Sequence, residues 1–176
     1  VGDNNKIREN VTINRGTAAK GKTCVGSGNL LMESVHVAHD AFVGNDCIIG
    51  NGTKLAGEII IDDHAIISAN VLMHQFCRVG GYTMVGGGTR FSQDIPPYTI
   101  CAREPVAYCG LNLVGLRRRG FSNELIENIH NAYRIIYQGG VPLNEALQKV
   151  REEVPASPEI DYIIEFIENS KRGFVH

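Results

Sequence analysis

The sequence predicts an all-β fold, a parallel β-helix, followed by a C-terminal α-helical segment. An aliphatic residue recurs at every sixth position without a break through eleven hexads, from Val25 to Val85. The fourth residue after each of these anchors is usually small or β-branched, and glycine often follows the anchor directly. Beyond Pro96-Pro97 the apolar residues take helical spacing instead. A period of six is the signature of hexapeptide β-helix repeats, so we assign residues 1–97 to a β-helix domain and residues 98–176 to a helical domain.

Each hexad is expected to form one short strand and one corner, and three hexads make one triangular coil. Residues 18 positions apart (three times six) then stack on one another, with the anchors inside and the coils roughly 4.8 Å apart. Glycines are expected to serve the tight corners. The alternating strands of a β-sandwich have a period of two and would not keep a phase of six over so long a stretch. The polar segment from Ala18 to Cys24 interrupts the repeat.

Three helices are expected after the repeat. Ser122 is a suitable N-cap for a helix that reaches about Gln138 and stops at Gly139-Gly140. A second helix is predicted from about Leu143 to Val154, and a third from Ser157-Pro158 to about Asn169. We expect these helices to cover the open end of the solenoid, whose last coil would otherwise expose a sheet edge.

Composition excludes several classes of protein. The 176 residues hold 17 basic and 19 acidic side chains, a near balance that argues against a dedicated nucleic-acid binder or a basic membrane arm. No apolar run approaches the ~18 residues of a membrane span, so no stable membrane insertion is expected. The five cysteines form no CxxC pair, which favours reduced thiols in the cytoplasm over disulfides. Val1 falls inside a repeat, so we expect a fragment that lacks N-terminal coils.

Stacking brings together residues that carry chemistry. His39 is expected under Gly57, with Gln75 one coil further, while Asp40 lies under Glu58. His36 and His74 fall on the same or adjacent coils, and a histidine beside the Gly57 N–H is a base beside an oxyanion donor. Asp40 either fixes the imidazole tautomer or merely forms a corner.

Two other interpretations of the histidines were weighed. A single histidine is most often a solvated side chain on a coil face, and we keep that interpretation for His64 and His130. Three histidines on a β-helix also bind zinc in the gamma-class carbonic anhydrases. The spacing of His36, His39 and His74 does not resemble that family's ligand pattern, so we expect no metal.

The segment from Arg103 to Arg119 holds four arginines and one acid in a nearly neutral chain. Arginine suits bidentate binding of phosphate, and the alternative is a solvated basic face.

Five segments, in order along the chain, carry a resemblance to a known family. The chain resembles the UDP-N-acetylglucosamine acyltransferases of lipid A synthesis, most specifically in the His-x2-His-Asp and Gly-Leu-Arg-Arg-Arg-Gly-Phe motifs. The segments are Val35–Asp40, Leu55–Gly57, Met73–Cys77, Gln93–Tyr98 and Gly115–Phe121.

The resemblance implies a left-handed β-helix, a homotrimer with active sites between subunits, and no cofactor. It implies transfer of a 3-hydroxyacyl chain from acyl carrier protein to the 3-hydroxyl of UDP-N-acetylglucosamine, the first step of lipid A biosynthesis. In these roles His39 is the general base, Asp40 its partner and the Gly57 N–H the oxyanion donor. The residue types fit, because a sugar hydroxyl is a poor nucleophile and a neutral imidazole must take its proton. The related UDP-3-O-acylglucosamine N-acyltransferase and a non-catalytic β-helix scaffold are the alternatives.

The resemblance also implies which residues bind the substrates. His36, His74 and Gln75 contact the sugar nucleotide, Asn112 and Arg118 hold its ribose and phosphate end, and Arg119 is a further candidate there. Glu58 stands at a sugar contact where the family often has histidine, and Val114 stands where an acidic ribose contact is common. Gly87 matches the residue that limits the acyl chain length, and a glycine there implies a long donor. The alternative is that Gly87 only turns a corner.

Overall fold

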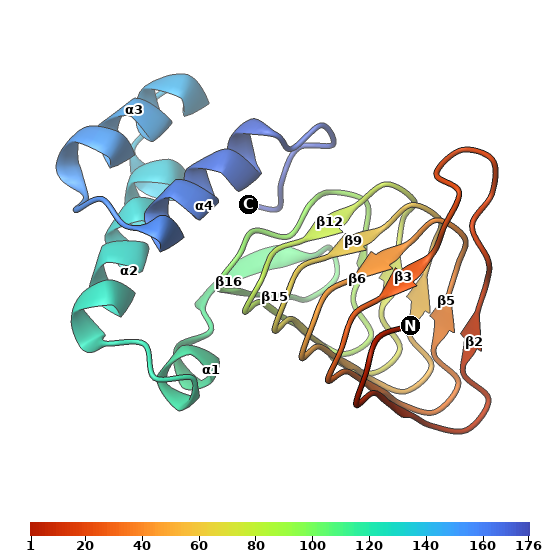
Figure 1. Ribbon diagram of the computed structural model, residues 1–176. Helices are drawn as coiled ribbons and strands as arrows, with labels where there is room; N and C mark the ends of the chain where they lie inside the picture. Colours follow the sequence, from red (N-terminus) through yellow and green to blue (C-terminus); the bar gives the residue numbers. More distant parts are fainter.

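The computed structural model describes residues 1–176 as a three-sided solenoid with helices at its C-terminal end (Figure 1). The chain winds through three sheets in turn, here called sheets A, B and C. Sheet A is formed by β1 (Lys6–Ile7), β4 (Leu30–Leu31), β7 (Ile48–Ile49), β10 (Ile66–Ile67), β13 (Met84–Val85), β15 (Thr99–Ala102) and β16 (Ala107–Leu111). Sheet B is formed by β2 (Thr12–Ile13), β5 (His36–Val37), β8 (Lys54–Leu55), β11 (Leu72–Met73) and β14 (Arg90–Phe91). Sheet C is formed by β3 (Cys24–Val25), β6 (Phe42–Val43), β9 (Ile60–Ile61) and β12 (Arg78–Val79).

The register of the sheets follows the hexads. Parallel partners stand 18 positions apart, as in His36 beside Lys54 and Val37 beside Leu55. The second residue of each strand is the aliphatic anchor and points inward, so that Leu31, Ile49 and Ile67 are fully buried. The period of six is therefore the period of one strand and one corner, and the predicted parallel β-helix is confirmed.

The insertion changes the register only where it lies between the paired strands, as it does for β1 with β4 and for β2 with β5. Thr12 of β2 pairs with His36 of β5, an offset of 24 rather than 18, whereas Cys24 of β3 pairs with Phe42 at the usual 18. The extra residues leave the stack as a loop between β2 and β3, seen in red at the upper right of Figure 1.

Glycine turns some of the corners, as expected, for example Gly52 with a φ of 68°. Most corners are turned by non-glycine residues with positive φ, such as Asp40 (60°), Glu58 (56°) and Phe76 (69°). The glycine after an anchor has ordinary φ but lies close to the next coil, since a Cβ on Gly50 would come within 2.5 Å of the Ala69 nitrogen. These glycines permit close stacking of the coils rather than tight turns.

The solenoid does not stop at Pro97. Strand β15 joins β13 in parallel and then turns back as β16, so sheet A continues to Leu111. A division at residues 97 and 98 therefore remains a prediction, and the segment after it begins with strands rather than helices.

The helices are α1 (Leu113–Arg118), α2 (Asn123–Gln138), α3 (Leu143–Glu153) and α4 (Pro158–Glu168). The three helices expected from the sequence are confirmed, and the caps are as predicted: the Ser122 hydroxyl accepts from the Leu125 N–H at 3.1 Å and that of Ser157 from the Ile160 N–H at 3.3 Å. No helix combines the length and apolarity needed to cross a membrane.

Helix α4 is fixed to sheet C by a polar cluster. The Tyr162 hydroxyl donates to Asp62 Oδ2 at 2.5 Å and accepts from the Gly81 N–H at 2.8 Å. Arg78 binds the same Asp62 oxygen through Nη2 at 2.8 Å and lies over the Phe166 ring at 4.5 Å. The helical segment is thereby held at a defined place beside the last coils.

Candidate active site

His39 and Asp40 form a pair at the corner between sheets B and C, here called the B–C corner. Asp40 has left-handed backbone geometry, so the two neighbouring side chains do not diverge as they would on a straight strand. His39 Nδ1 donates to Asp40 Oδ2 at 2.9 Å. The Asp40 side chain is fully buried, whereas 41% of the His39 side chain is exposed. The pair therefore presents the other imidazole nitrogen, Nε2, to the outside with no protein partner.

Asp40 is held by the insertion loop as well as by His39. Its Oδ1 accepts from the Thr17 N–H at 2.9 Å and its Oδ2 from the Thr17 hydroxyl at 2.5 Å. These bonds favour the ionised carboxylate, and the Thr17 hydroxyl above all holds the pKa of Asp40 below its usual value. An ionised Asp40 fixes the proton of His39 on Nδ1 and stabilises the imidazolium when His39 takes up a second proton.

Gly57 lies directly against the His39 ring, as the stacking of coils predicts. A Cβ at this position would stand 2.7 Å from both Cε1 and Nε2 of His39. The backbone N–H of Gly57 donates to no acceptor in the chain, whereas that of Glu58 donates to the His39 carbonyl at 3.1 Å. The glycine is thus required by the imidazole, and a free N–H stands beside it.

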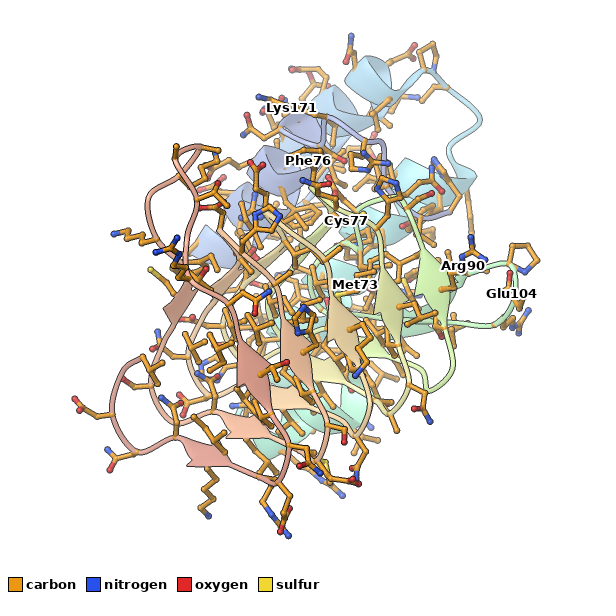
Figure 2. All side chains as sticks on the ribbon, turned by 90° about the vertical axis from the view of Figure 1, so that its right-hand side faces the viewer. Met73, Phe76, Cys77, Arg90, Glu104 and Lys171 are labelled. Carbon is orange, nitrogen blue, oxygen red and sulfur yellow. The ribbon has the colours of Figure 1, made fainter.

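The other residues expected near His39 lie on sheet B or the same corner. His36 projects outward from β5 and shares a hydrogen bond of 2.7 Å with the Thr12 hydroxyl. His74 follows β11, and its Nδ1 donates to the Gln75 carbonyl at 3.0 Å, which leaves Nε2 free. Figure 2 faces sheet B, with Met73 labelled in the sheet and Phe76 at the corner that follows it. Gln75, between them, stacks two coils from His39, so one chain gathers these side chains along one edge.

Glu58 and Asp40 line one cavity of about 410 Å³ on the sheet C side of this corner. Lys20 and Lys22 of the insertion loop and the exposed Phe42 and Ile60 of sheet C form other parts of its wall. Glu58 is half-buried at a left-handed corner position. The cavity therefore places Glu58 near two lysines, while its hydrogen bond to His39 runs through the backbone.

The structure places Asn112 and Arg119 at another edge, between sheets C and A, here called the C–A corner. Asn112 is buried, where its side chain donates to the Tyr82 carbonyl at 2.9 Å and accepts from the Gly115 N–H at 3.1 Å as the cap of α1. Arg119 Nη1 donates to His64 Nδ1 at 2.8 Å. The width of sheet C separates this corner from His39, so one chain does not bring the two predicted groups together.

Arg118 is exposed near the end of α1, and no ion pair holds it. Val114, on the same helix, is among the most exposed large apolar side chains, at 60%. Both are therefore accessible for contacts outside their own chain.

Gly87 does not lie above His39. It is exposed at the corner between sheets A and B, the third edge of the solenoid, so within one chain it lies at a different edge from His39. Its φ is ordinary, whereas the next residue, Gly88, has a φ of 70° and turns the corner. A Cβ at Gly87 would meet its nearest atom, the Ala69 carbonyl oxygen, at 3.3 Å. The corner therefore does not require glycine at position 87.

Two sets of contacts were not predicted. The Thr17 and Thr23 contacts to Asp40 cross an insertion, where the rule of 18 does not apply. His64 was expected to be solvated, yet it stacks on Tyr82 with ring centroids 4.7 Å apart and accepts from Arg119. The available signal was its spacing from Tyr82: the two residues are 18 positions apart and therefore stack on adjacent coils.

The remaining cavities and clusters lie elsewhere. A cavity of about 870 Å³ lies between β16, α1 and α2, where Tyr108, Arg117 and His130 form part of its wall. None of the predicted site residues lines it. The structure contains no group of three or more histidine, cysteine, aspartate or glutamate residues placed to hold a metal ion.

Comparison with known proteins identifies the family. Residues 94–175 match the family model described as UDP-N-acetylglucosamine O-acyltransferase, domain 2. The structure superposes on the UDP-N-acetylglucosamine acyltransferase of Bacteroides fragilis with a TM-score of 0.94 and 58% identity, over 99% of this chain and 80% of that chain.

The similarity extends to structures with lower sequence identity. The acyltransferase of Francisella novicida gives a TM-score of 0.95 at 38% identity, over 99% of this chain and 64% of that one. The Arabidopsis protein gives 0.93 at 34% identity, with the same shares covered. The fold is thus the left-handed β-helix that the resemblance implied. The chain belongs to the UDP-N-acetylglucosamine acyltransferase family and is an acyltransferase.

Proposed function

We propose that the protein transfers a 3-hydroxyacyl chain from acyl carrier protein to the 3-hydroxyl of UDP-N-acetylglucosamine, the first step of lipid A biosynthesis. One observation carries the proposal: His39 stands between an ionised, buried Asp40 and a glycine whose N–H is unbonded. This is a base with a fixed tautomer beside a donor for an oxyanion, the pair of groups that acyl transfer to a hydroxyl requires.

The steps follow from this geometry. His39 Nε2 takes the proton of the sugar hydroxyl while the oxygen attacks the thioester carbonyl. The Gly57 N–H stabilises the negative charge on the carbonyl oxygen, and Asp40 stabilises the imidazolium. When the intermediate collapses, the C–S bond breaks and the thiolate receives the proton from His39. The thioester is already activated, so the residues need form no covalent intermediate.

Binding of the sugar nucleotide is assigned to two edges of the solenoid. His36, His74 and Gln75, and Glu58 beside them, are proposed to contact the sugar at the B–C corner. Asn112, Arg118 and Arg119 are proposed to hold the ribose and phosphates at the C–A corner. The side-chain amide of Asn112 is already hydrogen-bonded to the Tyr82 carbonyl and to the N-terminus of α1. Its proposed role is therefore to fix the helix that carries Arg118 and precedes Arg119.

The separation of these two edges supports a homotrimer with each site shared by two subunits. Ordinary cyclic symmetry places one edge of a subunit beside another edge of its neighbour. The outer face of sheet A also carries a column of apolar side chains that are half-buried in the single chain: Leu30, Ile48, Ile66 and Met84. The trimer would bury this column and bring Gly87 of one subunit toward the groove of another. All five cysteines are free, in keeping with the reducing cytoplasm, where acyl carrier protein is available.

The test is an assay of the purified protein with 3-hydroxyacyl carrier protein and UDP-N-acetylglucosamine. We expect His39→Ala to lower kcat by at least ~10², the scale of a positioned general base. His130→Ala is the matched control, because His130 is exposed on α2, far from His39 in the sequence, and its charged neighbour is Glu127 at 3.9 Å. Activity of His39→Ala above half of the wild-type value would refute the base. Transfer to UDP-3-O-acylglucosamine instead would identify the N-acyltransferase, and absence of nucleotide binding would identify a scaffold.

A further inference from the structure

We propose that Thr17 is a positioning residue of the active site, which holds Asp40 in the orientation that His39 requires. Thr17 donates twice to the Asp40 carboxylate, from its N–H to Oδ1 at 2.9 Å and from its hydroxyl to Oδ2 at 2.5 Å. His39 Nδ1 donates to that same Oδ2 at 2.9 Å. The three donors fix the plane of a carboxylate that has no exposed surface.

The loop that carries Thr17 is itself fixed to this corner. The Thr17 carbonyl accepts from the Gly21 N–H at 2.7 Å. A Cβ on Gly16 would come within 2.2 Å of the Lys22 nitrogen, so the two ends of the loop touch. At its far end, the Thr23 hydroxyl accepts from the backbone N–H of Asp40 at 2.8 Å.

Comparison with other corners shows what this loop replaces. The corner residues Glu58, Phe76 and His64 donate their N–H to the carbonyl 19 positions earlier in the coil below. Asp40 donates instead to a threonine hydroxyl of the insertion. The loop therefore binds Asp40 through both its backbone and its side chain, and it does so at the one corner where the base lies.

The consequence rests on His39 acting as the base. With His39 Nδ1–H as the second donor to Oδ2, the Thr17 hydroxyl shares the carboxylate charge and prevents rotation of the carboxylate away from the ring. Without that hydroxyl, the negative charge on Asp40 Oδ2 is no longer shared and interacts more strongly with the His39 imidazolium. The orientation of the His39 ring is also less well fixed. The charged groups that line the same cavity, Lys20, Lys22 and Glu58, are unchanged by a substitution at Thr17.

The experiment compares Thr17→Val with Thr17→Ser in the full protein. Valine keeps the shape and the backbone N–H but removes the hydroxyl, whereas serine keeps the donor. We expect Thr17→Val to lower kcat roughly tenfold, less than loss of the base itself, with KM for UDP-N-acetylglucosamine within about twofold. The acid limb of its kcat/KM profile should move to higher pH, because the imidazolium is stabilised by a more concentrated charge. Thr17→Ser should restore both.

Thr83→Val is the matched control, since it removes a buried threonine hydroxyl that donates to the Pro96 carbonyl at another corner. It should lower Tm and leave the pH profile in place. Wild-type kcat and pH profile for Thr17→Val, in a protein whose His39→Ala variant is inactive, would show that Thr17 only shapes the loop. Failure of Thr17→Ser to restore activity would also overturn the proposal. An active His39→Ala variant would overturn the proposed function instead.

Discussion

At the scale of single residues, Gly57 is a position where one added carbon atom is expected to displace the proposed base, His39. Gly57→Ala would place Cβ 2.7 Å from His39 Nε2, closer than real Cβ contacts allow, so the ring must turn away. The backbone at Gly57 has ordinary φ, so alanine is compatible with the turn itself. We expect kcat to fall by roughly 10², the effect of misplacing a catalytic group by about 1 Å. Steady-state kinetics together with Tm check this, and a fully active variant would show that His39 need not stay where it is.

His64 gives a prediction on pH. Burial first, and then the Arg119 guanidinium, lower the pKa of His64 below its usual value. The His64 imidazole therefore binds a proton more readily in the unfolded chain than in the folded one. As a result, the free energy of unfolding falls as pH drops below about 6.5. His64→Gln retains an acceptor for Arg119 and has no such proton to bind. Urea unfolding at pH 7.5 and 5.5 should show a smaller loss of stability for the variant than for the wild type, and equal losses would contradict the assignment.

At the scale of elements, the attachment of α4 to sheet C depends on one phenol. Tyr162→Phe removes a bond to the Asp62 carboxylate and leaves the Gly81 N–H without its acceptor. We expect a loss of about 2 kcal/mol in the free energy of unfolding. Tyr108→Phe is the control, because the Tyr108 hydroxyl makes no hydrogen bond and its ring packing on Tyr137 is retained. Chemical denaturation measures both, and equal stability of the two variants would rule out the anchoring role.

The elements also show what the sequence could predict. The strands follow from the anchors because every anchor from Val25 to Val85 is buried, so a hexad out of phase would expose an aliphatic side chain to water. The caps at Ser122 and Ser157 could also be predicted, because each involves only residues three positions apart. The contacts of Thr17 were not, because the insertion breaks the rule of 18 that made His39 and Gly57 neighbours. The place of Gly87 does follow from the rule: 48 positions from His39 is not a multiple of 18, so within one chain Gly87 lies at another edge.

At the scale of the whole molecule, Gly87 tests whether subunits share the site. The position is exposed with ordinary φ, and a Cβ would meet the Ala69 carbonyl oxygen at 3.3 Å, so Gly87→Met needs only a small local shift to fold. In a trimer whose groove lies between subunits, methionine would fill the end of the groove and exclude terminal methylenes, each worth about 0.8 kcal/mol. We expect the ratio of kcat/KM for long over short donors to fall. An unchanged ratio would show that Gly87 does not limit the acyl chain. A monomer in light scattering would show that no neighbouring subunit contributes to the site.

The insertion between β2 and β3 has one more consequence. It leaves and rejoins the solenoid at the same corner, and the coils on either side keep their alignment because only the offset between them changes, from 18 to 24. Length can thus be added or removed at a corner without disturbing which aliphatic side chains meet in the interior. The stability of such a protein and the side chains at its corners can therefore vary separately. Mutation and selection can change the loop around the proposed base while the buried core of the solenoid stays the same.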